Sequence, residues 1–323
     1  MYTEYFGPVD RSSISHSETH LGNAARKLQQ GGLVAFPTET VYGLGAPILN
    51  DGALKRLYQV KERPKERSLP IHVANLDQLK FVASEIPVEV QKLAKEFLPG
   101  PLTLILKKHP NLSPLITGDR ETIAVRISSD PIARRLIELT GCPLAVPSAN
   151  ESGRPSPTKA SHVLEDFNGK IEGIVDGGEV EYGMESTLIS LEDPIRPTLF
   201  RFGVISQKEI EKVLNRKVVV HPLALVLNSN SSFTKLRCAV RLFSSWDEMK
   251  IYIKLSSGSK RLIMSDEISG SEKKDHFKLR GNNLYEGLRL ADREGYAEVL
   301  VMCSSQIKQN VLLLNRLKQI ART

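Results

Sequence analysis

LVAFPTETVYGLGA (residues 33–46) places four apolar residues directly before a turn rich in proline, threonine and glycine. The apolar run 33–36 predicts a buried strand. Thr38 offers a hydroxyl just beyond that strand, and Gly43 and Gly45 let a ligand approach the main chain closely. Ligands of open α/β sheets bind at such strand ends. The stretch therefore predicts an α/β fold with a site at this strand end, and a strained turn without a ligand is the open alternative.

Strand and helix patterns alternate on both sides of that stretch, whereas residues 1–18 look irregular. Ser206 and Glu209 form a capping box, and Asp51 is expected to cap a helix. The pattern predicts a mixed, twisted sheet with helices across residues 1–215. The expected strands are 33–36, 70–74, 102–107, 122–128 and 144–146, and the expected helices are 20–30, 51–60, 87–97, 130–140 and 206–214.

A second domain is expected over residues 237–323, after a polar linker at 216–236 that contains HPLALVLNSNSSF. Apolar strands alternate there with helices of 10 to 15 residues, which is typical of a parallel, Rossmann-like sheet. No GxGxxG follows its first strand, so dinucleotide binding is not expected. The strands are CAVRLFS, RLIMSD and EVLVMC, and the helices are 246–255, 283–294 and 306–320.

Composition limits the class of protein. No apolar run is long enough for a membrane span, and the first residues lack the pattern of a signal peptide. The three cysteines are far apart, so neither a disulfide framework nor a zinc site is expected. A cytoplasmic location of the protein is therefore expected. The net charge of +7 is uneven: residues 237–323 hold 16 Lys/Arg against 10 Asp/Glu, a surplus of six. That surplus can attract phosphates or nucleic acid, or can simply be a solvated surface.

Basic side chains gather in KERPKERSLPIHV (61–73). Lys61 supplies a point charge and Arg63 a bidentate fork, in a loop stiffened by proline, which suits a polyphosphate. A solvated loop interleaved with glutamates is the alternative. His72 interrupts an apolar strand, where a lone histidine is more often structural than a ligand.

Two later segments combine polar groups with strand ends. Arg126 interrupts the apolar strand TIAVRI (122–127), so it needs an anion, which a carboxylate substrate or a structural salt bridge would supply. The loop VPSANESGRPSPT (146–158) offers hydroxyls and turn amides to phosphate, although it is not a Walker loop, and an ordinary Ser/Pro loop is the alternative. No nucleophile–base pair stands out. The residues therefore favour chemistry in which a polyphosphate is positioned and neutralised.

Taken in order, FPTETVYGLGA, KERP, FLPGPLTLILK, TIAVRIS, PLAVPSANESGRPSPT and ESTLISL resemble the YrdC-like family of threonylcarbamoyl-AMP synthases. The resemblance covers residues 20–215. NLYEGLRLADREGYAEVLV and LLLNRLKQIA resemble the C-terminal domain of the long, two-domain members.

The resemblance implies a nucleotidyltransferase that converts L-threonine, bicarbonate and ATP to threonylcarbamoyl-AMP, pyrophosphate and water. Mg²⁺ would accompany the ATP, and a downstream transferase would pass the product to tRNA. The resemblance implies that Lys61, Arg63 and Thr38 take part in catalysis. It assigns L-threonine to Thr38, His72, Arg126, Val146 and Ser186, and ATP to Lys61, Arg63, Thr122, Ser148, Asn150, Ser156 and Arg201.

The sequence departs from the family in two places. Arg201 is followed by Phe202-Gly203 instead of Pro-Gly, and residues 216–236 lack the Lys-Tyr-x-His-Tyr-like segment of long members. A non-catalytic protein that binds double-stranded RNA or tRNA is the main alternative. A carbamoyl-adenylating domain of the hydrogenase-maturation type is a second one. Weak RNA binding is compatible with the enzyme, and no membrane is expected as a partner.

Overall fold

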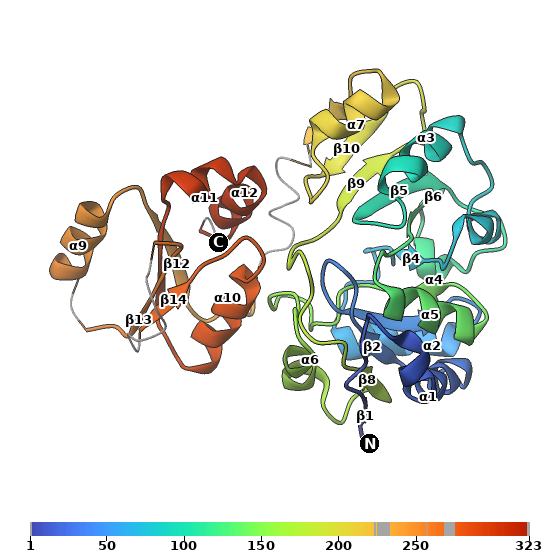
Figure 1. Cartoon of the computed structure of the whole chain (residues 1–323), viewed down its shortest axis with the longest axis horizontal. Coiled ribbons are helices and arrows are strands. Elements are labelled where there is room, and N and C mark those ends of the chain that lie inside the picture. The colour runs from blue at the N-terminus through green and yellow to red at the C-terminus, as the bar shows by residue number, and fades with distance from the viewer. Residues whose placement is uncertain (1, 223, 225–232, 257, 268–274, 322–323) are drawn as a thin grey trace. The chain divides into compact units, whose positions relative to one another are not determined.

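The computed structural model describes residues 2–222, 224, 233–256, 258–267 and 275–321 (Figure 1). The chain forms two units: residues 1–152 with 156–225, and residues 226–323 with 153–155. Part of the predicted linker, residues 223 and 225–232, lies outside the described residues, so its boundaries stay a prediction. Within the described part, no helix is both long enough and apolar enough to span a bilayer.

The first unit is built on an eleven-stranded mixed sheet, in the order β1-β8-β2-β3-β7-β4-β6-β5-β9-β10-β11. Parallel and antiparallel pairs both occur, as the sequence predicted. The strands are β1 (Glu4–Phe6), β2 (Val34–Phe36), β3 (Gly43–Pro47), β4 (Ile71–His72), β5 (Leu102–Lys107), β6 (Thr122–Arg126), β7 (Leu144–Ala145), β8 (Gly173–Val175), β9 (Thr187–Ser190), β10 (Thr198–Arg201) and β11 (Val219–Val220).

Helices of the first unit pack their apolar stripes on this sheet. Leu21 and Leu28 of α1 are fully buried with Leu136 of α5, in a cluster that also contains Phe36 of β2. A larger cluster buries Leu54 and Leu57 of α2 with residues of several strands, among them Leu104 of β5 and Val125 of β6. The helices are α1 (Glu18–Gln29), α2 (Asp51–Lys61), α3 (Val88–Phe97), α4 (Pro114–Thr117), α5 (Pro131–Thr140), α6 (Ala160–Phe167) and α7 (Gln207–Leu214), with 3₁₀ turns η1 (Ile14–Ser17) and η2 (Leu76–Phe81).

Three local predictions for this unit were wrong. The first residues are not all irregular, because Glu4–Phe6 pairs in parallel with β8. The glycines of the opening motif lie in β3, which pairs antiparallel with β2, rather than only in a turn. Asn50, not Asp51, caps α2, since its side chain accepts a hydrogen bond from the Ala53 amide. The capping box of Ser206 and Glu209 is confirmed at the start of α7.

The second unit is an all-parallel sheet in the order β12-β15-β13-β14, which confirms the Rossmann-like prediction. Its strands are β12 (Ala239–Phe243), β13 (Arg261–Ser265), β14 (His276–Lys278) and β15 (Glu298–Met302); β14 was not predicted. Its helices are α9 (Trp246–Leu255), α10 (Leu284–Arg293), α11 (Ser305–Gln309) and α12 (Val311–Ile320). The single helix expected at 306–320 is thus broken at Asn310, whose side chain accepts from the Leu313 amide and caps α12.

Candidate active site

A cavity of about 280 Å³ opens in the first unit. It lies where the β2–β3 connection, the strands β4, β6 and β5, and the loops before β9 and after β7 meet. Eight of the twelve predicted site residues line it: Thr38, Arg63, His72, Arg126, Val146, Ser148, Ser186 and Arg201. Thr40, Val41, Gly43, Ser68, Pro70, Thr103, Ala124, Pro147, Glu185 and Leu188 complete the lining.

Strand register explains why residues far apart in sequence meet here. His72 on β4 stands opposite Arg126 on β6, and Arg126 stands opposite Thr103 on β5. Because side chains directly opposite each other project to the same face of a sheet, these three side chains share one face. The Ser186 hydroxyl lies 2.7 Å from the Thr103 hydroxyl. The sheet thus gathers one row of polar groups from four segments.

Arg126 is held on three sides. Its Nε donates to the Gly100 carbonyl at 3.2 Å, one terminal nitrogen donates to the Thr40 hydroxyl at 2.8 Å, and the other lies 2.6 Å from the Glu39 carboxylate. The Arg126 and Glu39 side chains are 5% and 2% exposed. Two anions were expected for Arg126, a substrate carboxylate or a side chain of the protein. The structure contains the second, as the salt bridge with Glu39. A guanidinium has five N–H groups, so two remain for a further acceptor.

Glu39 keeps its negative charge although it is buried. Burial alone would raise the pKa of Glu39, but the Arg126 cation and a hydrogen bond from the Ser128 hydroxyl bring it below its ordinary value. The paired charges therefore leave Arg126 oriented but largely neutralised.

His72 is buried beside this pair. Burial first, and the Arg126 cation second, lower the pKa of His72 to about 3. The imidazole is therefore neutral at neutral pH. Its Nδ1 has no hydrogen-bond partner among the described residues. A neutral ring at the cavity wall can donate or accept one hydrogen bond, but it is a poor base at neutral pH.

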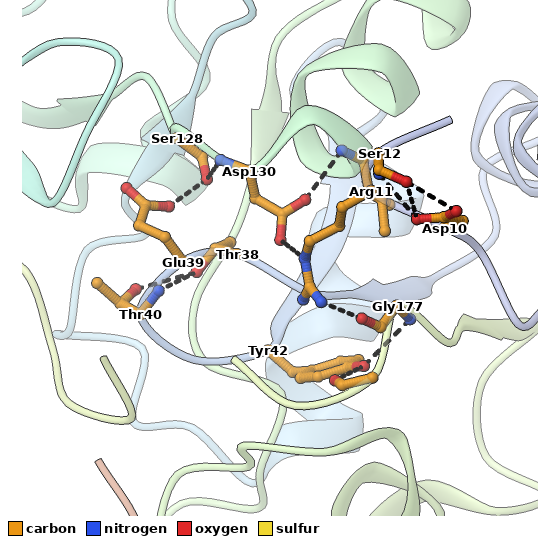
Figure 2. Close-up of polar contacts among 12 residues, drawn as sticks. Asp10, Arg11, Ser12, Thr38, Glu39, Thr40, Tyr42, Ser128, Asp130 and Gly177 are labelled. Atoms are coloured by element: carbon orange, nitrogen blue, oxygen red, sulfur yellow. Dashed lines mark hydrogen bonds and ion pairs between the residues drawn. The ribbon is translucent and has the colours of Figure 1, made fainter. Parts of the chain in front are cut away.

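Thr38 lies at the turn between β2 and β3 (Figure 2). Its hydroxyl donates to the Val41 carbonyl at 2.6 Å and accepts from the amides of Thr40 and Val41, each at 3.2 Å. The hydroxyl thus holds the turn in shape. Its proton is engaged, so it is not poised as a nucleophile.

Two further arginines reach the cavity from loops. Arg63 donates to the carbonyls of Arg67 and Ser68, and burial lowers its pKa to about 10, which leaves it a cation at neutral pH. Arg201 donates to the carbonyl and the hydroxyl of Ser186 at 2.9 and 3.0 Å. Arg63 and Arg201 bring positive charge to the cavity, and Arg126, paired with Glu39, adds oriented N–H groups. Glu185 is the one carboxylate among the lining residues.

Lys61 does not line the cavity, although the sequence placed it on the triphosphate. It is 2% exposed, and its ammonium donates to the main-chain carbonyls of Ser148 and Asn150. Burial, then the nearby Arg63, lowers the pKa of Lys61 well below its usual value. Lys61 thus supports the loop that carries Ser148, through hydrogen bonds to its main chain, without lining the cavity itself.

Three other predicted residues lie outside the lining. Thr122 starts β6, four residues from Arg126, which is about 13 Å along a strand. Asn150 is buried and donates to the Glu151 carbonyl at 2.9 Å. Ser156 adjoins the cavity through Glu185, to which its hydroxyl donates at 3.1 Å. Their assigned contacts with ATP stay predictions.

The sequence patterns did not single out the two carboxylates of this site, Glu39 and Glu185. Glu39 stands between two threonines that were singled out, and Arg126 signalled a need for an anion. Nothing in the sequence says which of 37 acidic residues pairs with it. Glu185 precedes Ser186 and was passed over in the same way. No group of three or more His, Cys, Asp or Glu side chains that could hold a metal occurs in the described part of the chain.

Comparison with known proteins gives matches over both units. The family model Sua5_yciO_yrdC, described as "Telomere recombination", matches residues 26–203. A threonylcarbamoyl-AMP synthase of Pyrococcus abyssi is 52% identical over 199 residues, which is 62% of this chain and 58% of that relative. The chain thus matches less than two thirds of this relative's length.

Two solved structures resemble the whole chain. A variant of P. abyssi Sua5 with two alanine substitutions has a TM-score of 0.86 at 38% identity, covering 99% of this chain and 96% of that one. P. abyssi Sua5 in complex with L-threonine has a TM-score of 0.83 at 39% identity, covering 94% and 95%.

Proposed function

Because the chain belongs to the Sua5/YciO/YrdC family, we propose that it makes threonylcarbamoyl-AMP from L-threonine, bicarbonate and ATP. The observation that carries the proposal is the convergence of Arg63, Arg126 and Arg201 on one cavity with hydroxyls and a neutral histidine. The relatives support it: one bears the synthase name, and P. abyssi Sua5 has been solved with L-threonine.

The reaction needs two steps that balance. The threonine amine and bicarbonate give N-carboxythreonine and water. The new carboxylate then attacks the α-phosphorus of ATP, an O–P bond forms, and pyrophosphate leaves with the electrons of the broken bond. Charge accumulates on phosphate oxygens, so positioned cations are the main requirement of the second step.

Arg126 is the proposed ligand of the threonine carboxylate. Two of its N–H groups are left after its contacts with Gly100, Thr40 and Glu39. Guanidinium and carboxylate match geometrically, which favours a paired contact. His72 lies beside it as a neutral hydrogen-bonding group, Ser186 shares the same row, and Thr38 and Val146 shape the wall.

Arg63 and Arg201 are the proposed ligands of the triphosphate, with Ser148 on the same wall. ATP enters as its Mg²⁺ complex. Mg²⁺ usually keeps waters and phosphate oxygens and takes one or two carboxylates. The cavity lining, with Glu185 as its carboxylate, fits that mode. We place Lys61 behind the loop, where it holds the main chain of Ser148 and Asn150.

The product of such an enzyme is an activated acyl-adenylate, which water would destroy. A downstream transferase that carries the threonylcarbamoyl group to tRNA is therefore the proposed consumer, in the cytoplasm where tRNA is used. Direct, weak binding of RNA would depend on the basic excess of residues 237–323. No observation specifically supports the alternative hypothesis of a non-catalytic RNA-binding protein.

The test is pyrophosphate release from ATP and Mg²⁺, measured with and without L-threonine and bicarbonate, with mass spectrometry of the product. Release that needs both substrates, together with the mass of threonylcarbamoyl-AMP, is expected. Release with carbamoyl phosphate but not threonine would point to the hydrogenase-maturation type of reaction. No release from folded protein, combined with salt-sensitive RNA binding, would refute the synthase proposal.

A further inference from the structure

The buried contacts around Arg126 continue away from the cavity. The Glu39 carboxylate that pairs with Arg126 also accepts from the Ser128 hydroxyl, and that hydroxyl accepts from the Asp130 amide at 3.2 Å. Glu39, Ser128 and Asp130 are each 3% exposed or less. Figure 2 shows contacts that join Glu39, Ser128, Asp130 and Arg11 in this order, with the main-chain nitrogen of Asp130 as the link to Ser128.

Arg11 belongs to the N-terminal arm, which we define as residues 7–13. Its Nε donates to Asp130 at 2.8 Å, and it also donates to the Gly177 carbonyl. The arm is fixed at its base, because Val9 is buried and its amide donates to the Asp176 carbonyl at 2.7 Å. A turn at residues 10–12 holds the arm around Arg11. In this turn the Ser12 amide donates to the Asp10 carboxylate at 2.8 Å.

Arg11 is the ion-pair partner of the buried Asp130 carboxylate. Asp130 is 3% exposed, and its burial, with a smaller contribution from the buried Glu39 carboxylate nearby, raises the pKa of Asp130 above its ordinary value. The Arg11 cation and its hydrogen bond oppose that rise. A buried charge that loses its partner must neutralise itself or move. Because the Asp130 amide donates to the Ser128 hydroxyl, a shift of the Asp130 main chain would move Ser128, then Glu39, and hence the guanidinium of Arg126.

We propose that Arg11, Asp130 and Glu39 are positioning residues that fix the Arg126 guanidinium for the carboxylate of the amino-acid substrate. The inference rests on the proposed function. It extends the site to the N-terminal arm, which lies outside the segment matched by the family model.

The experiment compares Arg11→Ala with Arg135→Ala in the full-length protein. Arg135 also joins the N-terminal region to α5, through its ion pair with Glu18 on α1, but neither partner touches the Glu39 network. Steady-state pyrophosphate release gives kcat and the KM values for threonine and ATP, and calorimetry gives the Kd of threonine. Circular dichroism melts check that each variant is folded.

Arg11→Ala is expected to raise the KM and Kd of threonine about tenfold, below the roughly hundredfold cost of a misplacement of about 1 Å, because Arg11 acts on Arg126 only through Asp130, Ser128 and Glu39. The KM of ATP should change less than about twofold. Glu39→Gln should have the larger effect on threonine, Arg11→Lys should recover part of the loss, and Arg135→Ala should match the wild type.

Two outcomes overturn the inference separately from the function. If the wild type works and Arg11→Ala keeps the threonine KM and Kd of Arg135→Ala, the arm has no positioning role. If Arg11→Ala lowers only the folded fraction, with unchanged KM and Kd values, its role is merely structural. If the wild type shows neither threonine-dependent release nor threonine binding, the proposed function fails and the inference falls with it.

Discussion

At the scale of single residues, burial decides which of the predicted cations can meet a substrate. Lys61 and Arg63 are two positions apart in the sequence, yet only Arg63 lines the cavity. Lys61 is the last residue of α2, whereas Glu62 turns the chain into the left-handed region with a φ of 49°. That turn sends Arg63 toward the cavity and leaves Lys61 inside.

This difference predicts separate effects for the two residues. Lys61→Met removes the donor to the main-chain carbonyls of Ser148 and Asn150, which should lower the free energy of unfolding by about 2 kcal/mol and weaken ATP use. Arg63→Ala should weaken ATP use with little change in stability. Urea unfolding and the ATP KM measure both quantities. A Lys61→Met protein as stable as the wild type would contradict the supporting role.

His72 predicts a dependence of stability on pH. Its pKa is about 3 in the folded chain and about 6.5 when unfolded. Between these values the unfolded chain binds more protons, so the free energy of unfolding falls as the pH falls from about 6.5 toward 3. For this one group the loss at pH 5 is about 2 kcal/mol.

His72→Asn should remove that part of the acid sensitivity. Urea unfolding at pH 7.5 and pH 5 of the variant and the wild type gives the difference directly. His16→Asn is the matched control, because His16 is exposed on η1. Equal losses of stability on acidification in wild type and His72→Asn would show that His72 is not held neutral.

At the scale of elements, the β2–β3 hairpin and the loop after β7 shape one wall together. The Leu44 amide donates to the Pro147 carbonyl at 2.8 Å, and the Ala149 amide donates to the Tyr42 carbonyl at 2.7 Å. The close approach of these two segments requires a small residue at Gly43. A Cβ there would stand 2.3 Å from a methyl carbon of Val146.

Gly43→Ala is therefore expected to displace the Val146 side chain, which lines the cavity. We expect a rise of about tenfold in the threonine KM, and a loss of stability of about 1–3 kcal/mol from overpacking. Gly22→Ala in α1 is the control, because its Cβ would meet no atom within 4 Å. That variant should gain about 0.5–1 kcal/mol. Unchanged kinetics and stability in Gly43→Ala would contradict the close packing.

At the scale of the whole molecule, each unit has a hydrophobic core of its own. Phe243, Met249, Leu300 and Met302 pack in the second unit with Trp246, which is the one tryptophan of the sequence. Tryptophan fluorescence therefore reports on the second unit. Leu300 and Leu136 are both fully buried, in different units.

Leu300→Ala should lower the free energy of unfolding of the second unit by about 2–5 kcal/mol. The fluorescence transition in urea should then move to lower urea, while Leu136→Ala should leave that transition in place. Threonine-dependent pyrophosphate release below the transition checks that the first unit of Leu300→Ala is intact. If both variants moved the fluorescence transition equally, the chain would unfold as one cooperative body.

The amino-acid sequence by itself determined the class of fold and the family. Apolar runs marked β2, β5 and β6, the helical period marked α1, α3 and α5, and the serine–glutamate pair marked the start of α7. These signals are local, because the chain neighbours of each residue set its pattern. The ordered motifs also predicted the family, which the family model confirmed.

Only the tertiary structure decided the partners of the site. Glu39 pairs with Arg126 across 87 residues of chain, and Arg11 reaches Asp130 across 119. Strand pairing also turned the glycine-rich motif into β3, and it placed His72 beside Arg126. Such choices depend on which surfaces meet when the sheet forms and on which charges are buried together. No local pattern carries that information, because the free energy of a buried charge depends on its neighbours in space.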